Sequence, residues 1–144
     1  MTESTACVCI NVRAAAQQLT RIYDQALRPR GMTITQFSQL NTIRNLGEST
    51  LMQLSDATGL DRSTLGRNVR LLEAMGLIKM QVGKQDARTR VIARTKKGRS
   101  AIREGVPLWL SIQEKLTRQL GHDKRHLLEE LMSDLASPTL MDEK

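Results

Sequence analysis

Basic, amide and hydroxyl side chains are concentrated between positions 62 and 70 of the sequence. They are Arg62, Ser63, Thr64, Arg67, Asn68 and Arg70. Leu65, Val69 and Leu72 recur among them at helical spacing, so a helix here would bury its apolar stripe and turn the polar groups outward. Arginine matches the acceptors on guanine, and asparagine matches the donor and acceptor on adenine, in the major groove of duplex DNA. The segment therefore predicts a helix that reads bases.

Within this segment, Arg67 and Asn68 are the best candidates for base contacts. Ser63 and Thr64, near the predicted helix start, are suited to contact bases or to donate to phosphates beside free backbone N–H groups. The alternative is an ordinary solvated helix surface.

A short helix and a tight turn precede the polar segment. Thr50 and Gln53 have capping-box spacing, and Gly59 is suited to end the helix that they begin. Asp61 is a good N-cap for the next helix. With the small Ser55 four residues before the glycine, this spacing predicts two helices that cross closely, as in a helix-turn-helix.

A β-hairpin is expected directly after the second of these helices. Its alternating apolar positions are Ile78, Met80, Val82, Thr89, Val91 and Ala93, on either side of a polar tip over residues 83–87. Lys84, Arg88 and Arg90 extend positive charge beyond the helix, which favours the DNA-binding interpretation over the solvated surface.

The charge of the chain is concentrated in the same region. The 144 residues include 22 Lys and Arg against 15 Asp and Glu, a formal net charge of +7. Residues 61–103 alone carry 12 basic and 3 acidic side chains. Such an excess favours an anionic partner. Since Tyr23, Phe37 and Trp109 are the only aromatic residues, stacking on single strands is disfavoured and duplex DNA is the better prediction.

Apolar periodicity predicts further helices outside the basic segment, over residues 8–27, 33–46, 96–120 and 124–135. Thr33 and Gln36 have capping-box spacing at the start of the second range. Pro107 predicts a kink in the third. The expected fold is a single domain, mainly α with a small β-hairpin.

Several motifs resemble the MarR family of bacterial transcriptional regulators, and the resemblance covers nearly the whole chain. They are residues 33–37, residues 51–54, residues 72–78, Asp86-Ala87-Arg88 and Thr95-Lys96-Lys97-Gly98. The resemblance implies one MarR-like domain over residues 1–144, in which residues 33–98 form a winged helix-turn-helix. Residues 6–30 and 99–137 would then form a helical dimerisation layer.

By the same resemblance, Asp86 and Arg88 would support the wing and its minor-groove or phosphate contact. Two residues depart from the family pattern. Ala87 replaces a common basic residue, which predicts a weaker wing contact, and Arg94 stands where a leucine usually precedes the threonine, which is expected to disturb strand packing.

The resemblance also implies a two-fold homodimer. Such a dimer would hold two recognition helices about 34–36 Å apart and would prefer a palindromic operator. The apolar stripes of the flanking helices exceed what a monomer of this size readily buries, which is compatible with a dimer.

Regulators of this type usually respond to a small molecule or an oxidant, and Cys7 and Cys9 are the candidate redox or metal sensor. A helix start favours the thiolate form, and thiolates react with oxidants or bind soft metals. Residues two apart point in divergent directions, so a disulfide or shared metal between subunits is favoured over a bond within one chain. The alternative is a pair of ordinary thiols.

Two other pairs of residues are weaker candidates for the input. His122 and His126 have the spacing of metal ligands on a helix, with surface histidines as the favoured alternative, so no metal site is predicted. Tyr23 and Arg21 are candidates to line a ligand cleft, with core packing of the tyrosine and solvation of the arginine as the alternatives.

These observations predict a sequence-specific regulator of transcription that binds double-stranded DNA, a repressor released by a small ligand or by a thiol or metal event. The alternative is a winged-helix protein-interaction module or a nonspecific architectural DNA-binding protein. An enzyme is disfavoured because no nucleophile-and-base arrangement, phosphate-binding glycine loop or cluster of metal ligands is found, and no cofactor is expected. Without a membrane span or a signal peptide in the sequence, a cytoplasmic location is expected.

Overall fold

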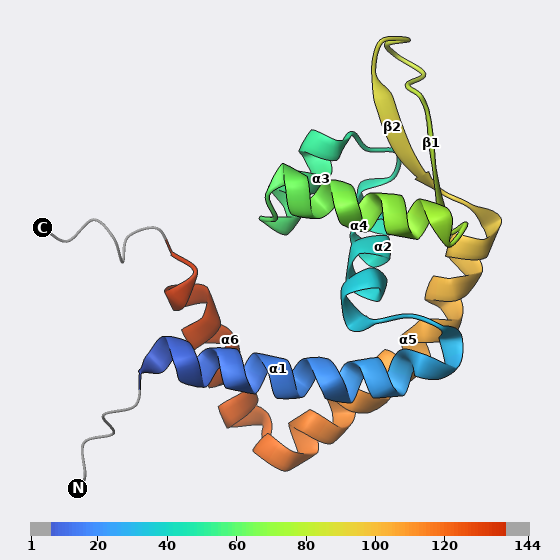
Figure 1. The fold of residues 1–144 in the computed structure, drawn as a ribbon. Coiled ribbons are helices and arrows are strands. Elements are labelled where there is room, and N and C mark those ends of the chain that lie inside the picture. The colour runs from blue at the N-terminus through green and yellow to red at the C-terminus, as the bar shows by residue number, and fades with distance from the viewer. Residues whose placement is uncertain (1–6, 138–144) are drawn as a thin grey trace, which may run out of the picture. The chain divides into compact units, whose positions relative to one another are not determined.

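The computed structural model describes residues 7–137, which form helices and one two-stranded antiparallel hairpin (Figure 1). In chain order the elements are α1 (Val8–Leu27), the 3-10 turn η1 (Arg28–Arg30), α2 (Ile34–Leu46), α3 (Leu51–Thr58), α4 (Arg62–Ala74), β1 (Ile78–Val82), β2 (Arg90–Arg94), α5 (Lys96–Leu120) and α6 (His122–Leu135). The expected fold class, mainly α with a small hairpin, is confirmed. Two compact units divide the chain, one ending at Trp109 and the other beginning at Leu110.

Side-chain caps fix the starts of α2 and α3. The Thr33 hydroxyl accepts from the Gln36 backbone N–H at 3.2 Å, and the Gln36 side chain accepts from the Thr33 N–H at 3.0 Å. Thr50 and Gln53 make the same reciprocal pair at 3.1 and 2.9 Å. Both predicted capping boxes are confirmed, because this motif depends only on residues three apart.

The hairpin pairs Ile78 with Arg94 at its base and Val82 with Arg90 at its tip. Strand pairing therefore continues through Arg94, at the position where the sequence predicted disturbed strand packing. The burial of β2 differs from the expected alternation, because Ile92 is fully buried beside Val91 while Ala93 is only half-buried. β2 packs against α2, and the α2–α3 linker also pairs with the edge of β2.

The core of the unit ending at Trp109 draws residues from α1 to α5. Its buried side chains include Leu27, Leu40, Ile43, Leu54, Leu65, Leu72, Ile78, Ile92 and Ile102. Two glycines let α5 approach this core closely. A Cβ on Gly98 would lie 2.0 Å from the carbonyl oxygen of Leu77, and one on Gly105 would lie 2.7 Å from the ring of Phe37.

The turn between α4 and β1 is fastened to the start of α5. The Thr95 N–H donates to the Leu77 carbonyl at 3.0 Å, and the Thr95 hydroxyl donates to the Gly76 carbonyl at 2.6 Å. The Lys97 ammonium donates to the Met75 carbonyl at 2.7 Å. These bonds tie the C-terminal end of α4 to α5, so the orientation of α4 is set from both ends. Pro107 lies inside α5, which continues on both sides of it, and a kink there stays a prediction.

The unit beginning at Leu110 contains the end of α5 and all of α6. Helix α6 begins at His122 rather than at the expected Lys124, because Gly121, with φ of 80°, turns the chain immediately before it. The Arg125 guanidinium donates to the Thr117 hydroxyl at 3.1 Å and to the Glu129 carboxylate at 2.9 Å. Within this unit, α6 leaves a row of apolar side chains exposed: Leu127, Leu128, Leu131, Met132 and Leu135. Across the described stretch, no helix combines the length and hydrophobicity needed to cross a bilayer.

Candidate nucleic-acid interface

Asp61 fixes the start of α4, the helix that carries the polar segment. One oxygen of its carboxylate accepts from the Thr64 backbone N–H at 2.8 Å, and the other accepts from the Thr64 hydroxyl at 2.7 Å. These bonds, the backbone one first, hold the pKa of Asp61 below its ordinary value. The predicted N-cap is confirmed. Thr64, predicted to face DNA, is half-buried and already uses its hydroxyl proton in the cap.

The outer face of α4 presents four of the predicted residues to solvent. Arg62, Ser63, Arg67 and Arg70 are exposed, whereas Asn68 is half-buried on the flank. Leu65, Val69 and Leu72 are buried on the opposite face, as predicted. Within residues 7–137, no carboxylate lies at ion-pair distance from the guanidinium of any of the three arginines. Their donors remain available for phosphates or base edges.

Gly66 lies on the same outward face, one turn from both Arg62 and Arg70, and the sequence interpretation passed over it. A Cβ there would meet no atom closer than the Arg70 guanidinium at 4.0 Å, and α4 continues through the position. Packing within the chain therefore does not require glycine. Glycine inside a helix also reduces stability, so its presence here suits a close approach by something outside the chain.

Asp86 is exposed, and its hydrogen bonds shape the tip of the hairpin. Its carboxylate accepts from the Arg88 backbone N–H at 2.9 Å, and its carbonyl accepts from the Thr89 N–H at 3.1 Å. The Gly83 N–H donates to the Thr89 carbonyl at 2.7 Å and closes the turn. The side chains of Arg88 and Arg90 are exposed, so the hairpin projects basic groups from a turn that Asp86 holds.

Lys84, the remaining hairpin residue predicted to bind DNA, lies beside a carboxylate that the sequence interpretation missed. Its ammonium is 3.5 Å from Glu48 Oε1, and the same oxygen accepts from the Gln81 side-chain amide at 2.9 Å. Glu48 belongs to the α2–α3 linker, far from the hairpin in sequence, and no local pattern connects the two.

Arg94, at the base of the hairpin, is half-buried and lies near two other arginines. Burial, followed by the charges of Arg44 and Arg99, lowers the pKa of Arg94 from its ordinary value. The Arg99 guanidinium donates to the Arg94 carbonyl at 3.2 Å. The departure from the family pattern at this position is thus accommodated by a partly solvated arginine at the edge of the core.

The two predicted sensor thiols lie at the start of α1. Cys7 occupies the N-cap position, Cys9 lies in the first turn, and both are exposed and free. Val8, Ile10 and Val12 are also exposed along this part of α1. Accessible thiols therefore lie at the end of α1 where apolar side chains are not covered by any other part of residues 7–137.

The weaker input candidates differ in their surroundings. Tyr23 is buried, which agrees with core packing, and Arg21 lines a surface hollow of about 520 Å³, so a ligand cleft shared by the two stays a prediction. The His126 imidazole lies 3.2 Å from the Glu130 carboxylate. Among residues 7–137, no three His, Cys, Asp or Glu side chains are grouped in a way that could hold a metal ion.

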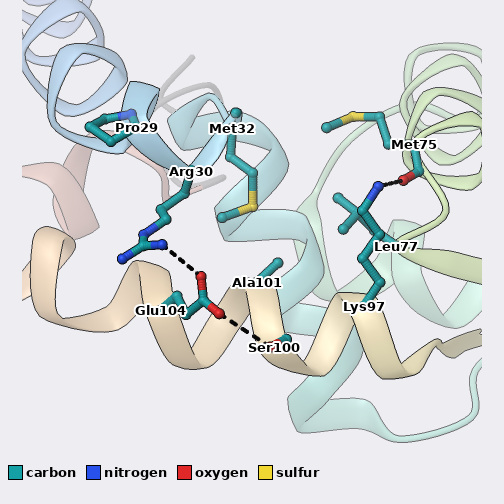
Figure 2. A pocket seen from close by; sticks show the side chains of 10 residues that line it. Pro29, Arg30, Met32, Met75, Leu77, Lys97, Ser100, Ala101 and Glu104 are labelled. Atoms are coloured by element: carbon teal, nitrogen blue, oxygen red, sulfur yellow. Dashed lines mark hydrogen bonds and ion pairs between the residues drawn. The ribbon is translucent and has the colours of Figure 1, made fainter.

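A second hollow, of about 530 Å³, lies within the unit ending at Trp109 (Figure 2). Met32, Met75 and Ala101 contribute apolar surface to it. Arg30 is paired with Glu104 at 2.9 Å, whereas the Lys97 ammonium donates to the Met75 carbonyl at 2.7 Å. The volume is typical of small-molecule sites, and Lys97 links the hollow to the end of α4.

Helices α3 and α4 pack on each other, α4 turns a basic face outward, and a basic hairpin follows it. Together these features define a winged helix-turn-helix protein. Comparison with known proteins assigns the family. The MarR family model matches residues 30–89. The M. tuberculosis transcriptional regulator MosR, in its crystal structure in complex with DNA, is 38% identical in sequence to this chain. The match covers 91% of this chain and 98% of that one, with a TM-score of 0.76. The chain belongs to the MarR family of transcriptional regulators.

More distant proteins are similar to this chain in sequence or in fold. An uncharacterised HTH-type transcriptional regulator of Bacillus cereus is 28% identical over 117 residues, which is 81% of this chain and 78% of that protein. The structure of an E. coli MarR mutant complexed with operator DNA shares the fold, with a TM-score of 0.83 at 22% identity over 90% of this chain and 94% of that one.

Proposed function

We propose that this protein is a sequence-specific repressor that binds a palindromic DNA duplex as a homodimer. The observation that carries the proposal is the outward face of α4, where Arg62, Arg67 and Arg70 are exposed and unpaired with any carboxylate of the described chain. Arg67 and Asn68 would read bases in the major groove. Ser63 and the free N–H groups at the helix start would bind phosphate.

The wing extends this surface along the DNA backbone. Lys84, Arg88 and Arg90 would contact phosphates or the minor groove, and Asp86 would support them by holding the turn. Each phosphate neutralised by such a residue releases counterions, so binding should weaken steeply as salt rises.

We further propose that residues 33–98 form the DNA-reading part of one MarR-like domain over residues 1–144. Residues 6–30 and 99–137 would supply the dimerisation layer. The exposed apolar side chains of α1 and α6 support this division, because a second copy would remove them from water. The protein would act in the cytoplasm, where its operator is accessible, without a cofactor and without catalysis.

Fluorescence anisotropy with the cognate palindrome, located by genomic footprinting, tests the DNA-binding surface. Arg67→Ala should lose about 1–3 kcal/mol of discrimination between the cognate and a mismatched site. Arg90→Ala should instead weaken all sequences alike and lower the salt slope by about one. The proposal fails if neither substitution changes binding, and a nonspecific architectural protein is indicated if the wild type does not prefer the palindrome over bulk DNA.

Oxidation of Cys7 and Cys9 is one proposed input. Two thiols and one peroxide would give a disulfide and two molecules of water, and the exposure of both thiols at the start of α1 supports this reaction. A gel shift with and without peroxide should show release of DNA by the wild type and retention by the Cys7→Ser and Cys9→Ser variants. Non-reducing electrophoresis distinguishes a bond between subunits from a bond within one chain, and release by both serine variants would reject the thiol input.

A small ligand in the hollow beside Lys97 is the other proposed input. The hollow offers apolar surface and one ammonium that no carboxylate of the described chain neutralises. Because Lys97 holds the Met75 carbonyl at the end of α4, a bound ligand would act on the recognition helix directly. Lys97→Met should then abolish release by an identified inducer, whereas Lys96→Met, at the exposed neighbouring position, should not.

A further inference from the structure

Glu48 connects the wing to the linker between α2 and α3. It follows Gly47, whose φ of 73° turns the chain at the end of α2, and it precedes Thr50, the N-cap of α3. From this linker its Oε1 reaches both the Gln81 amide, at 2.9 Å, and the Lys84 ammonium, at 3.5 Å. Gln81 of β1 and Lys84 of the wing tip thus contact the same carboxylate oxygen of Glu48.

The backbone beside Glu48 is fixed, so this contact does not depend on a mobile linker. Ser49 is buried, its N–H donates to the Ile92 carbonyl at 3.3 Å, and its carbonyl accepts from the Ile92 N–H at 2.7 Å. Ile92 is itself fully buried in the core. The carboxylate of Glu48 is therefore delivered to the wing from a rigid position.

The pairing of Lys84 with Glu48 opposes the role that Lys84 has in the proposed DNA complex. An ammonium already beside a carboxylate releases fewer counterions when it meets a phosphate, and the carboxylate itself repels the phosphate. Arg88 and Arg90, the arginines of the wing, are not weakened in this way, since no carboxylate of residues 7–137 lies at ion-pair distance from either of them.

We infer that Glu48 is a positioning residue that holds the wing through Gln81 and limits DNA affinity by pairing with Lys84. One side chain outside the DNA-contacting surface would thereby influence both the position of the wing and the affinity for DNA. The inference rests on the proposed DNA-binding function and adds to it a residue that restrains the free wing.

Glu48→Gln separates the two roles of this side chain. The amide oxygen still accepts from Gln81, while the charge beside Lys84 is removed. An ion pair at a site this exposed is worth little, so we expect DNA binding to tighten by about two- to five-fold at low salt. The slope of log affinity against log salt should become steeper by up to about one, and the gain should vanish at high salt.

A double-mutant cycle with Lys84→Ala locates the effect. If Glu48 acts through Lys84, Glu48→Gln should leave DNA affinity unchanged in the Lys84→Ala background. Asp56→Asn is the matched control, because Asp56 is an exposed carboxylate that lines the same surface hollow as Glu48 and makes no ion pair with Lys84. It should change affinity little in either background.

The DNA affinities of these variants decide whether Glu48 acts through Lys84. The inference is overturned if Glu48→Gln binds no tighter than the wild type, if its gain persists without Lys84, or if Asp56→Asn gives an equal gain. Thermal denaturation of Glu48→Gln should match the wild type, so that a folding defect is recognised. Failure of the wild type to bind duplex DNA would reject the proposed function instead.

Discussion

Among single residues, two glycines inside helices have opposite surroundings. Gly98 lies in the first turn of α5 against the carbonyl of Leu77, and any side chain there would overlap that oxygen. Gly66 lies on the open face of α4, where a methyl group meets only the end of the Arg70 side chain. One glycine is required by packing within the chain, and the other is not.

The same substitution should therefore change stability in opposite directions. Gly98→Ala forces α5 away from the α4–β1 turn and should lower the free energy of unfolding by about 2–4 kcal/mol, within the range of overpacking and lost hydrogen bonds. Gly66→Ala should raise it by about 0.5–1 kcal/mol, because alanine stabilises a helix interior. Urea denaturation of both variants measures the two changes, and a loss of stability in Gly66→Ala would contradict this account.

Gly66→Ala should also weaken binding to the palindrome despite its greater stability. If α4 lies in the major groove, a methyl group between Arg62 and Arg70 would keep the helix from its closest approach to the DNA. We expect at least a ten-fold loss of affinity by anisotropy, with unchanged circular dichroism. Equal or tighter binding would mean that this face of α4 does not approach DNA closely.

At the scale of elements, α4 is held at both ends by different chemistry. Asp61 caps its start by accepting two hydrogen bonds from Thr64, while Thr95, just before α5, and Lys97, in the first turn of α5, donate to the carbonyls of Gly76 and Met75 just after the end of α4. The first contact is local and depends on charge, and the second joins α4 to α5. A change at either end reaches the residues proposed to read bases.

The Asp61 cap predicts how stability depends on pH. Because folding lowers the pKa of Asp61, its stabilising contribution is complete above the unfolded pKa, about 3.9, and is lost as pH falls through the lower folded value. Asp61→Ala should therefore lower the melting temperature at pH 7, and the difference from wild type should shrink below about pH 4. Asp61→Asn, which keeps an acceptor without a titrating charge, is the control. A difference that stays constant from pH 7 to pH 2 would contradict the role of the ionised cap.

At the scale of the whole molecule, the excess of positive charge and the exposed apolar row of α6 belong to different stretches of the chain. Residues 61–103 carry 12 basic side chains and 3 acidic ones, whereas residues 104–144 carry 5 basic and 8 acidic ones. The basic stretch contains α4 and the hairpin, and the acidic stretch contains the apolar row of α6. This separation suits one surface for DNA and another for a second copy of the chain.

Leu131→Glu tests the surface assigned to dimerisation. Leu131 is 47% exposed in the single chain, so a glutamate should not unfold α6, but it should place a charge in the middle of the proposed interface. We expect a shift from dimer to monomer in analytical ultracentrifugation and a loss of at least ten-fold in operator affinity, since one reading head would bind alone. Lys124→Glu, an exposed position on the same helix, should remain dimeric. A dimeric Leu131→Glu variant would remove α6 from the interface.

What the sequence determined by itself was local. Both capping boxes, the Asp61 cap and the burial of Leu65 and Val69 could be predicted, because each depends on residues three or four apart along one helix. The family motifs indicated the winged fold for the same reason, since they record turns and helix ends.

Only the tertiary structure decided which distant residues meet. Glu48 beside Lys84, the Leu77 carbonyl against Gly98, and the pairing of Ser49 with Ile92 join segments with no shared periodicity. Such contacts follow from how the helices and the hairpin pack around a common core, because close packing allows each side chain only one set of neighbours. Local propensity fixes the elements, and the core fixes their partners.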